Sequence, residues 1–252
     1  MIRVGLLGCG NVGRIIAEHQ DGFEIVALFD KVRERADSLA RSSGAKVSPD
    51  FESFIRENFD IVVEAASVAA VRLYGQPVLE QGKDLIILSV GALADDDFKE
   101  QMIETARSHG RKIHIPSGAI LGLDNLKIGR ISPIHKLLLR STKSPQSLGI
   151  ESDRRMLIFR GRANDCIRQF PRNINVAVAL ELAAGREAEV EIWLDPAVER
   201  NIHEVFAEGD FGDIYIRVNN VPSPDNPSTS YMAALSILTL LKNLNQPLIV
   251  GT

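Results

Sequence analysis

The 252-residue sequence predicts an α/β protein: a doubly wound parallel sheet, an inserted α+β domain and a final helix that returns to the first domain. Three observations lead to this prediction. Residues 1–116 alternate apolar strand-like runs with helix-like segments, residues 119–227 consist mainly of β-like segments, and residues 230–244 form an apolar helical pattern. We therefore assign residues 1–118 and 228–252 to the first domain and residues 119–227 to the second.

The first domain is expected to contain apolar strands that alternate with amphipathic helices. Continuous apolar strands are typical of a parallel sheet that is covered on both faces. The expected strands are 2–7, 25–29, 46–48, 61–63, 85–90 and 112–115. The expected helices follow the first glycine turn and then occupy 32–42, 68–81 and 96–108.

The first strand ends in a glycine turn, a helix and a second strand follow, and Asp30 comes directly after that strand. This order is the Rossmann dinucleotide-binding fingerprint. In it, the first glycine forms the tight turn, the second lets the backbone approach a pyrophosphate, and the third lets the helix pack on the strand. Asp30 would accept a hydrogen bond from a ribose hydroxyl, which favours NAD, although Lys31 and Arg33 nearby keep NADP as an alternative. The predicted cofactor-binding residues here are Gly8, Gly10, Asn11, Val12, Gly13 and Asp30.

Bulk composition excludes several other classes of function. The formal charge of −4 argues against a nucleic-acid-binding protein, and no apolar run is long enough to span a bilayer. The first strand begins at once, so we expect no signal peptide. With only Cys9 and Cys166, the chain is expected to reside in a reducing, cytoplasmic setting and to hold no metal.

The second domain is expected to form an open sheet with segregated helices. Its predicted strands are 135–140, 156–160, 190–193, 203–206 and 213–218, its helices are 163–169 and 174–183, and 221–227 is a proline-rich turn region. Ligands of parallel α/β sheets lie beyond the carboxyl ends of the strands. That rule adds the small-residue segments 65–67, 89–92 and 116–119 as places where a cofactor could lie.

A dehydrogenase also needs a proton acceptor near its substrate, and histidine is the usual one. His19 and His109 are expected on exposed helix positions, and His114 is expected to be structural in a sheet strand. His135 follows a proline and lacks polar neighbours in the sequence. His203 lies in a polar stretch at the entrance of a predicted strand, which makes it the best candidate.

Two further polar groups are open to more than one interpretation. Asn173 fits the N-cap of the helix at 174–183, which would leave Asn175 at its second position and able to reach a ligand amide. Arg160 and Arg162 flank Gly161 and could bind a carboxylate, but an exposed charged turn is the preferred interpretation.

Several motifs together resemble the L-aspartate dehydrogenase family. They occur in family order across almost the whole chain, together with the N-terminal fingerprint. They are His114-Ile115-Pro116-Ser117-Gly118-Ala119-Ile120 with Gly122-Leu123-Asp124, Phe170-Pro171-Arg172-Asn173-Ile174-Asn175-Val176-Ala177, Asp195-Pro196 through Asn201-Ile202-His203, Gly209-Asp210-Phe211-Gly212, and Asn226-Pro227-Ser228-Thr229-Ser230.

The resemblance implies NAD(P)-dependent oxidative deamination of L-aspartate to iminoaspartate, which hydrolyses to oxaloacetate and ammonia and can feed NAD biosynthesis. It implies that His203 is the catalytic acid/base and that Ala119 and Asn175 contact the cofactor. It also implies a Rossmann domain with an inserted α+β domain that mediates assembly of a homodimer, and a C-terminal helix that returns to the first domain. Neither nucleic acid nor a membrane is an expected partner.

The chain departs from the family pattern at Arg160-Gly161-Arg162, where an acidic residue before the glycine and a serine after it are expected. This departure keeps open a dehydrogenase of the same fold that acts on another amino or dicarboxylic acid. A dihydrodipicolinate-reductase-like enzyme is disfavoured because the chain has no adjacent histidine pair, and a non-catalytic NAD-sensing module is a further alternative. Spacing alone does not rank the cations that could hold substrate carboxylates, which include Lys136, Arg160, Arg162 and Arg200.

Overall fold

The computed structural model describes residues 1–170 and 174–251, which fold into two compact units. The first unit comprises Met1–Pro116 and Ala233–Ile249, and the second comprises Ser117–Met232 with the end of the chain. Most of the last helix, α10 (Tyr231–Asn243), belongs to the first unit, where its Lys242 pairs with Asp21 at 2.6 Å. The predicted return of the C-terminal helix is therefore confirmed. No helix in the described ranges is long and apolar enough to cross a membrane.

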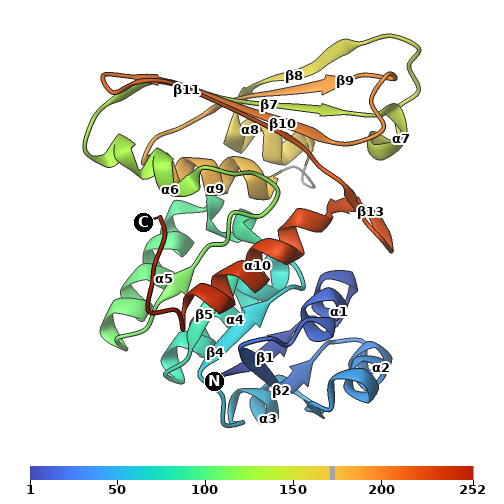
Figure 1. Ribbon diagram of the computed structural model, residues 1–252, viewed down its shortest axis with the longest axis vertical. Helices are drawn as coiled ribbons and strands as arrows, with labels where there is room; N and C mark the ends of the chain where they lie inside the picture. Colours follow the sequence, from blue (N-terminus) through green and yellow to red (C-terminus); the bar gives the residue numbers. More distant parts are fainter. Residues whose placement is uncertain (171–173, 252) are drawn as a thin grey trace. The chain divides into compact units, whose positions relative to one another are not determined.

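The first unit is built on a six-stranded sheet in the order β3-β2-β1-β4-β5-β6, and every neighbouring pair is parallel (Figure 1). Its strands are β1 (Ile2–Leu7), β2 (Phe23–Phe29), β3 (Lys46–Val47), β4 (Ile61–Glu64), β5 (Asp84–Ile87) and β6 (Ile113–His114). Its helices are α1 (Asn11–Glu18), α2 (Arg33–Ser43), α3 (Phe51–Ile55), α4 (Val68–Glu80), the 3-10 turn η1 (Val90–Ala94) and α5 (Asp96–Ser108). The predicted doubly wound parallel sheet is confirmed.

The strand order creates a topological switch point between β1 and β4. From β1 the chain winds outward through β2 and β3, and it then crosses to the other side of β1 to form β4. The loops after β1 and β4 consequently leave the same edge of the sheet in opposite directions, and Ala65 N donates to Leu7 O at 2.9 Å between them. Open α/β sheets bind their ligands at this edge.

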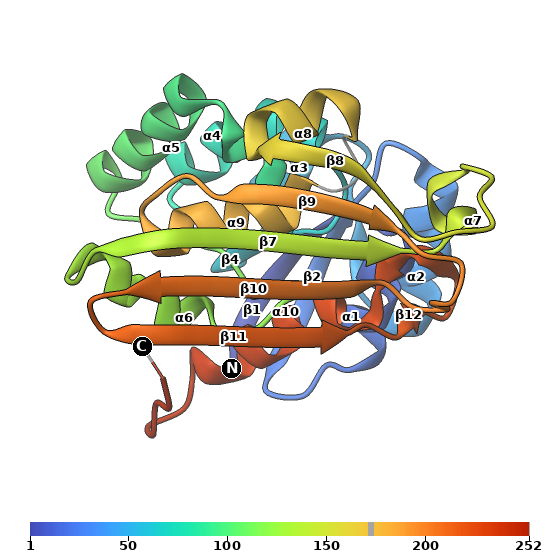
Figure 2. The same cartoon turned by 90° about the horizontal axis from the view of Figure 1, so that it is seen from above.

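The second unit is a five-stranded mixed sheet in the order β11-β10-β7-β9-β8, which Figure 2 shows face-on. Strands β7 and β9 run parallel, and the other neighbours are antiparallel. The strands are β7 (Ile134–Lys143), β8 (Met156–Arg162), β9 (Glu189–Leu194), β10 (Ile202–Gly209) and β11 (Gly212–Asn219). The short elements α6 (Leu123–Leu126), η2 (Lys127–Arg130), α7 (Pro145–Leu148), β12 (Pro222–Ser223) and β13 (Asn226–Ser230) complete the unit with the helices α8 (Ala163–Gln169) and α9 (Ile174–Ala184).

Helices α6, α8 and α9 lie on one face of this sheet (Figure 1). That face carries the core of the unit, in which Leu139, Val190 and Val205 from the central strands pack with Leu180 of α9. Alternation along each strand then decides which side chains lie in this helix-covered interior and which lie on the opposite face.

The largest differences from the sequence prediction lie where local pattern is weak. Strand β7 continues to Lys143, beyond the predicted end at 140, because its polar end is paired on both sides, by β9 and by β10. Residues 226–230, predicted as part of a turn region and the start of a helix, form β13 against β12. Helix α3, with five residues, is too short to show a helical period.

Candidate active site

The glycine turn after β1 has the geometry that its sequence predicts. Gly8 has φ +105°, and a Cβ there would lie 2.7 Å from the main chain of Ala65 across the switch point. A Cβ on Gly13 would lie 2.3 Å from Gly8 O, so α1 packs against the turn only with glycine at this position. A Cβ on Gly10, in contrast, would have no neighbour within 4 Å. The packing of the protein explains Gly8 and Gly13, whereas the open space at Gly10 is suited to a ligand.

The N-terminus of α1 is arranged to receive an anion. Gly10 is its N-cap and offers no capping side chain, and its first turn carries no acidic residue. Main-chain N–H groups at Asn11 and Val12 and the helix dipole therefore favour a negatively charged group here. These features fit the pyrophosphate of a dinucleotide, and the helix begins at the edge of the sheet where that group is expected.

Asp30 lies directly after β2 and is held by two main-chain donors. Cys9 N donates to Oδ2 and Val32 N donates to Oδ1, both at 2.8 Å. Each carboxylate oxygen can accept a second hydrogen bond, so the side chain can still receive a ribose hydroxyl. Burial, and then the charge of Asp30, raises the pKa of the Cys9 thiol to about 12, so Cys9 is a packing residue that does not ionise near neutral pH.

His203 is the second residue of β10, and the structure encloses it in the interior of the second unit. Its register partner is Ser141 of β7, and Ser141 Oγ forms a hydrogen bond with His203 Nδ1 at 2.8 Å. The residue is only 7% exposed. Burial, and then the nearby charge of Lys143, lowers the pKa of His203 to about 3. The imidazole is consequently neutral at pH 7, with one nitrogen fixed and Nε2 left for other chemistry.

The other histidines differ from His203 in environment. His19 and His109 are exposed, as predicted, and His114 is half-buried in β6. His135 was expected to lack polar company, but it forms a hydrogen bond with Asp210 at 2.6 Å on the surface. The sequence could not show this contact because the two residues are 75 positions apart. His203 is thus the one histidine of the five that is buried.

Lys143 is a functional candidate that the sequence analysis missed. It ends β7 on the same face as Ser141, is 8% exposed, and burial lowers its pKa to about 8. Within the described residues its ammonium has neither a hydrogen bond nor an ion pair. Besides His203, Cys166 of α8 interacts electrostatically with Lys143, and burial raises the pKa of this thiol to about 11, so it is uncharged too. The alternation Leu137, Leu139, Ser141, Lys143 is the signal that could have identified both polar residues as interior.

A hydrogen-bonded asparagine connects Ala119 to the strand that carries His203. Asn220, 3% exposed, donates from Nδ2 to Ala119 O at 3.1 Å, and its main-chain N donates to Asn201 O at 2.9 Å. The segment that contains Ala119 is therefore held beside the entrance of β10. Asn220 is a second residue that the sequence analysis did not single out, because its role depends on pairing between segments 101 residues apart.

Asn175 is the second residue of α9, which is the position predicted for it. The helix packs against the sheet face to which His203 belongs, through Ala177 and Leu180. Asn173, predicted as the N-cap, lies outside the described residues. Within the second unit, the structure thus places Ala119 beside the entrance of β10 and Asn175 on a helix that covers the face of His203.

The arginines at 160 and 162 have a structural explanation. They lie in β8, so the preferred interpretation of an exposed charged turn is wrong, although both side chains are largely exposed. Arg160 pairs with Glu189 of β9, and Arg162 pairs with Glu187 at 3.6 Å. Lys136 pairs with Glu208 at 2.6 Å across β7 and β10. Each of these three cations thus has an acidic partner, and Arg200, also a candidate for binding substrate, is exposed.

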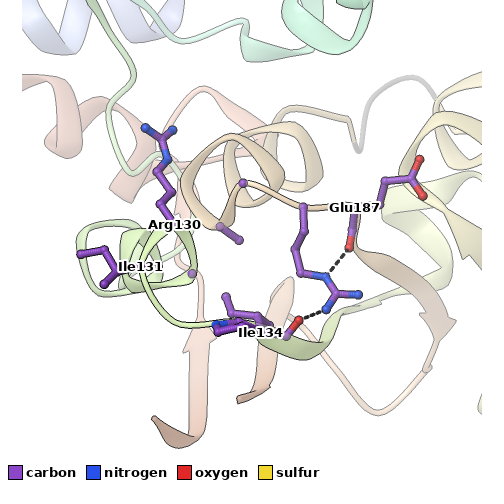
Figure 3. Close-up of a pocket in the computed structure, with 9 residues that line it drawn as sticks. Arg130, Ile131, Ile134 and Glu187 are labelled. Carbon is purple, nitrogen blue, oxygen red and sulfur yellow. Dashed lines mark hydrogen bonds between the residues drawn. The ribbon is translucent and has the colours of Figure 1, made fainter. Parts of the chain in front are cut away.

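A cavity of about 550 Å³ lies elsewhere in the second unit (Figure 3). It is lined by residues such as Arg130, Ile134 and Glu187, near the start of β7. Two arginines that line it form hydrogen bonds with main-chain oxygens. Arg186 donates to Ile134 O, and Arg130 donates to Leu182 O at 2.8 Å. Ser141 lies seven positions after Ile134 on the extended strand, a distance of roughly 23 Å, so this cavity is distinct from the site around His203.

Two protein-family models match successive parts of the chain. A family model described as aspartate dehydrogenase, C-terminal, matches residues 124–244, which include His203 and Lys143. A second model, described as the NAD-binding domain of homoserine dehydrogenase, matches residues 5–116, which include the glycine turn. The first match also includes Asn175, and Ala119 lies between the two matched ranges.

Relatives that match over their full length are named L-aspartate dehydrogenase. The chain is 61% identical to an L-aspartate dehydrogenase of Methanospirillum hungatei, with all of both chains covered, and 43% identical to one of Methanothermobacter thermautotrophicus, with 100% and 99% covered. The crystal structure of an aspartate dehydrogenase from Thermotoga maritima superposes with a TM-score of 0.87 at 29% identity, with all of both chains covered. An amine dehydrogenase of Mycobacterium smegmatis, at 15% identity and a TM-score of 0.62, shares the fold. On sequence and fold, the chain belongs to the L-aspartate dehydrogenase family.

Proposed function

We propose that this protein oxidises L-aspartate with NAD, giving iminoaspartate, which water converts to oxaloacetate and ammonia. One observation of the structure carries the proposal: the unit that resembles the aspartate dehydrogenase C-terminal domain encloses a neutral histidine, His203, fixed by Ser141 at 2.8 Å. A base is required because the amine of aspartate is protonated near neutral pH and must lose a proton before hydride can leave the α-carbon. His203 is available in the form that accepts a proton.

The hydrogen bond to Ser141 defines how His203 would act. For Nε2 to accept a proton, Nδ1 must carry the ring hydrogen and donate it to Ser141 Oγ. Accepting the proton creates an imidazolium, which burial opposes, since the pKa is about 3 without substrate. A carboxylate of the substrate supplies the negative charge that raises this pKa toward neutrality. The same imidazole could then activate the water that attacks the imine.

The cofactor is assigned to the first unit. Bound NAD supplies the hydride acceptor of the reaction. The N-terminus of α1 would hold the pyrophosphate next to Gly10, and Asp30 would accept a ribose hydroxyl. We propose a preference for NAD over NADP because a 2′-phosphate would face the negative charge of Asp30. Ala119 and Asn175 are proposed to contact the nicotinamide end of the cofactor. Asn220 holds the segment of Ala119 in place, and helix α9 carries Asn175.

The activity is tested by following NADH absorbance after NAD and single L-amino acids are mixed with the purified protein. We expect NADH to form with L-aspartate and oxaloacetate and ammonia to accumulate in equal amounts. Activity with a different amino acid and none with aspartate would identify another substrate for the same fold. Absence of turnover with every amino acid, although NAD binds, would favour a non-catalytic NAD-binding module.

We also propose a homodimer that is located in the cytoplasm. The helices of the second unit cover one sheet face, and the opposite face presents large side chains, among them the exposed Tyr215 and the partly exposed Trp193. Both cysteines are free and buried, which suits a reducing compartment. Analytical ultracentrifugation should give twice the chain mass of 27.7 kDa, and a species at 27.7 kDa alone would contradict the dimer.

A further inference from the structure

We propose that Lys143 binds a carboxylate of the substrate beside His203 and thereby selects a dicarboxylic amino acid. This inference rests on the proposed function and assigns a substrate contact to a residue outside the predicted site.

The charge of Lys143 is isolated among the described residues. Lys143 is more than nine-tenths buried, and its ammonium finds no hydrogen-bond or ion-pair partner within the part of the chain that the structure describes. Burying an unpaired charge is costly, so buried lysines are normally paired. The ionisable groups that face it are Cys166 of α8 and His203 of β10, and both are uncharged at neutral pH. Among the residues that the structure describes, the surroundings of Lys143 therefore supply no anion to pair with its ammonium.

The position of Lys143 on β7 places it next to His203. Ser141 and His203 are register partners, and Lys143 lies two residues further along the same face of β7, which makes it the diagonal neighbour of His203. Diagonal positions on paired antiparallel strands are about 7–8 Å apart. A carboxylate between the imidazole and the ammonium could contact both. Aspartate, in which one or two carbon–carbon bonds separate the reacting carbon from each carboxylate, fits this spacing.

Three other cations of the second unit already have glutamate partners. Lys136, on the same strand, pairs with Glu208, while Arg160 and Arg140 pair with glutamates of β9 on the face away from His203. Replacing any of these leaves the charge beside His203 unchanged. Lys143 is thus the described cation best placed to form a new ion pair with the substrate.

Substrate binding and acid/base chemistry would then be coupled. Without an anion, Lys143 contributes to the low pKa of His203, second to burial. A carboxylate bound between them neutralises the ammonium and adds a negative charge next to the imidazole. Both effects raise the pKa of His203 when substrate is present. The imidazole therefore becomes an effective base only when a substrate with a suitably placed carboxylate is bound.

The test compares Lys143→Met with Lys136→Met, a matched change on the exposed face of the same strand. Methionine replaces the lysine stem and removes an unpaired buried charge, so Lys143→Met is expected to fold with an unchanged or higher Tm. We expect its KM for L-aspartate to rise about 100-fold, while kcat and the KM for NAD change little. Lys136→Met should resemble wild type. A fall in kcat with unchanged KM would overturn the binding role.

A binding assay separates this inference from the proposed function because it needs no turnover. Succinate, a dicarboxylate without an amine, should raise the Tm of wild type and of Lys136→Met in the presence of NAD, and should leave Lys143→Met unshifted. Butyrate, with one carboxylate, should have a smaller effect. Equal stabilisation of wild type and Lys143→Met by succinate, equal effects of succinate and butyrate, or no stabilisation of wild type would each overturn the inference, whichever amino acid is oxidised.

Discussion

Glu64 in the first unit and Lys143 in the second are both ionisable residues with buried side chains, but their surroundings differ. Glu64 is 0% exposed and accepts four hydrogen bonds, from the main-chain N of Ala66, Ser67 and Ser89 and from Ser89 Oγ, at 2.8–2.9 Å. Lys143 has no such partner within the described ranges, and its neighbours His203 and Cys166 are uncharged.

The contrast separates a structural charge from a functional one. Burial raises the pKa of Glu64, and the four donors oppose that rise by stabilising the carboxylate, which links the loops after β4 and β5 at the ligand-binding edge of the sheet. A buried charge that the protein itself satisfies fixes the fold. A buried charge that it leaves unsatisfied retains the capacity to bind an ion. The predictions below test this distinction, from the largest expected effect to the smallest.

The largest effect is expected at His203. His203→Ala removes the proposed base and should lower kcat with L-aspartate by about 100- to 10,000-fold. The dissociation constant of NADH, measured by its fluorescence, should be unchanged because the predicted dinucleotide-binding turn lies in the other unit. His135→Ala, which loses only a surface hydrogen bond to Asp210, is the control. Turnover by His203→Ala close to that of wild type would remove His203 from the mechanism.

Glu64→Gln should instead affect stability. The amide group presents N–H donors to backbone N–H donors, so at least one buried hydrogen bond is lost, at a cost of about 2–3 kcal/mol in the free energy of unfolding. Urea denaturation monitored by circular dichroism measures this change. Glu52→Gln, at an exposed helix position, should leave the free energy of unfolding almost unaltered. A neutral Glu64→Gln would show that its hydrogen bonds contribute little to the fold.

The low pKa of His203 predicts a pH dependence of stability. In the folded state the pKa is about 3, against an ordinary value of 6.5, so between these values the unfolded chain binds a proton that the folded chain does not. The neutral, buried His203 therefore contributes to the free energy of unfolding in full above pH 6.5, and this contribution is lost as the pH falls toward 3. Compared with His203→Gln, wild type should lose about 1.4 kcal/mol more per pH unit between about pH 6 and 4. Parallel pH profiles of the two proteins would show that His203 is not buried in its neutral form.

The smallest effect concerns cofactor choice. Asp30→Asn keeps an acceptor oxygen for the main-chain donors but removes the charge that would repel a 2′-phosphate. The ratio of kcat/KM for NAD to that for NADP should fall about tenfold, equivalent to about 1.4 kcal/mol. An unchanged ratio, or a wild-type enzyme that already prefers NADP, would contradict the role assigned to Asp30.

Local sequence patterns predicted much of the fold but only part of the candidate site. The glycine turn, Asp30 and the helices α8 and α9 follow from periodicity and turn chemistry, which act over a few residues. His203 was recognised from its polar neighbours in the chain. Lys143 and Asn220 were not, because their environments come from strand pairing between distant segments, such as the 62 residues that separate Ser141 from His203. Their importance lies in burial, which no local pattern specified.

The central claim is that a buried cation, unpaired among the residues that the structure describes, lies beside a neutral histidine and makes this protein a dehydrogenase of a dicarboxylic amino acid. It is tested most directly by initial rates of NADH formation with L-aspartate, L-alanine and L-norvaline at equal concentrations. The account predicts NADH with L-aspartate and almost none with the two monocarboxylic amino acids. Equal or faster NADH formation with alanine or norvaline would contradict it.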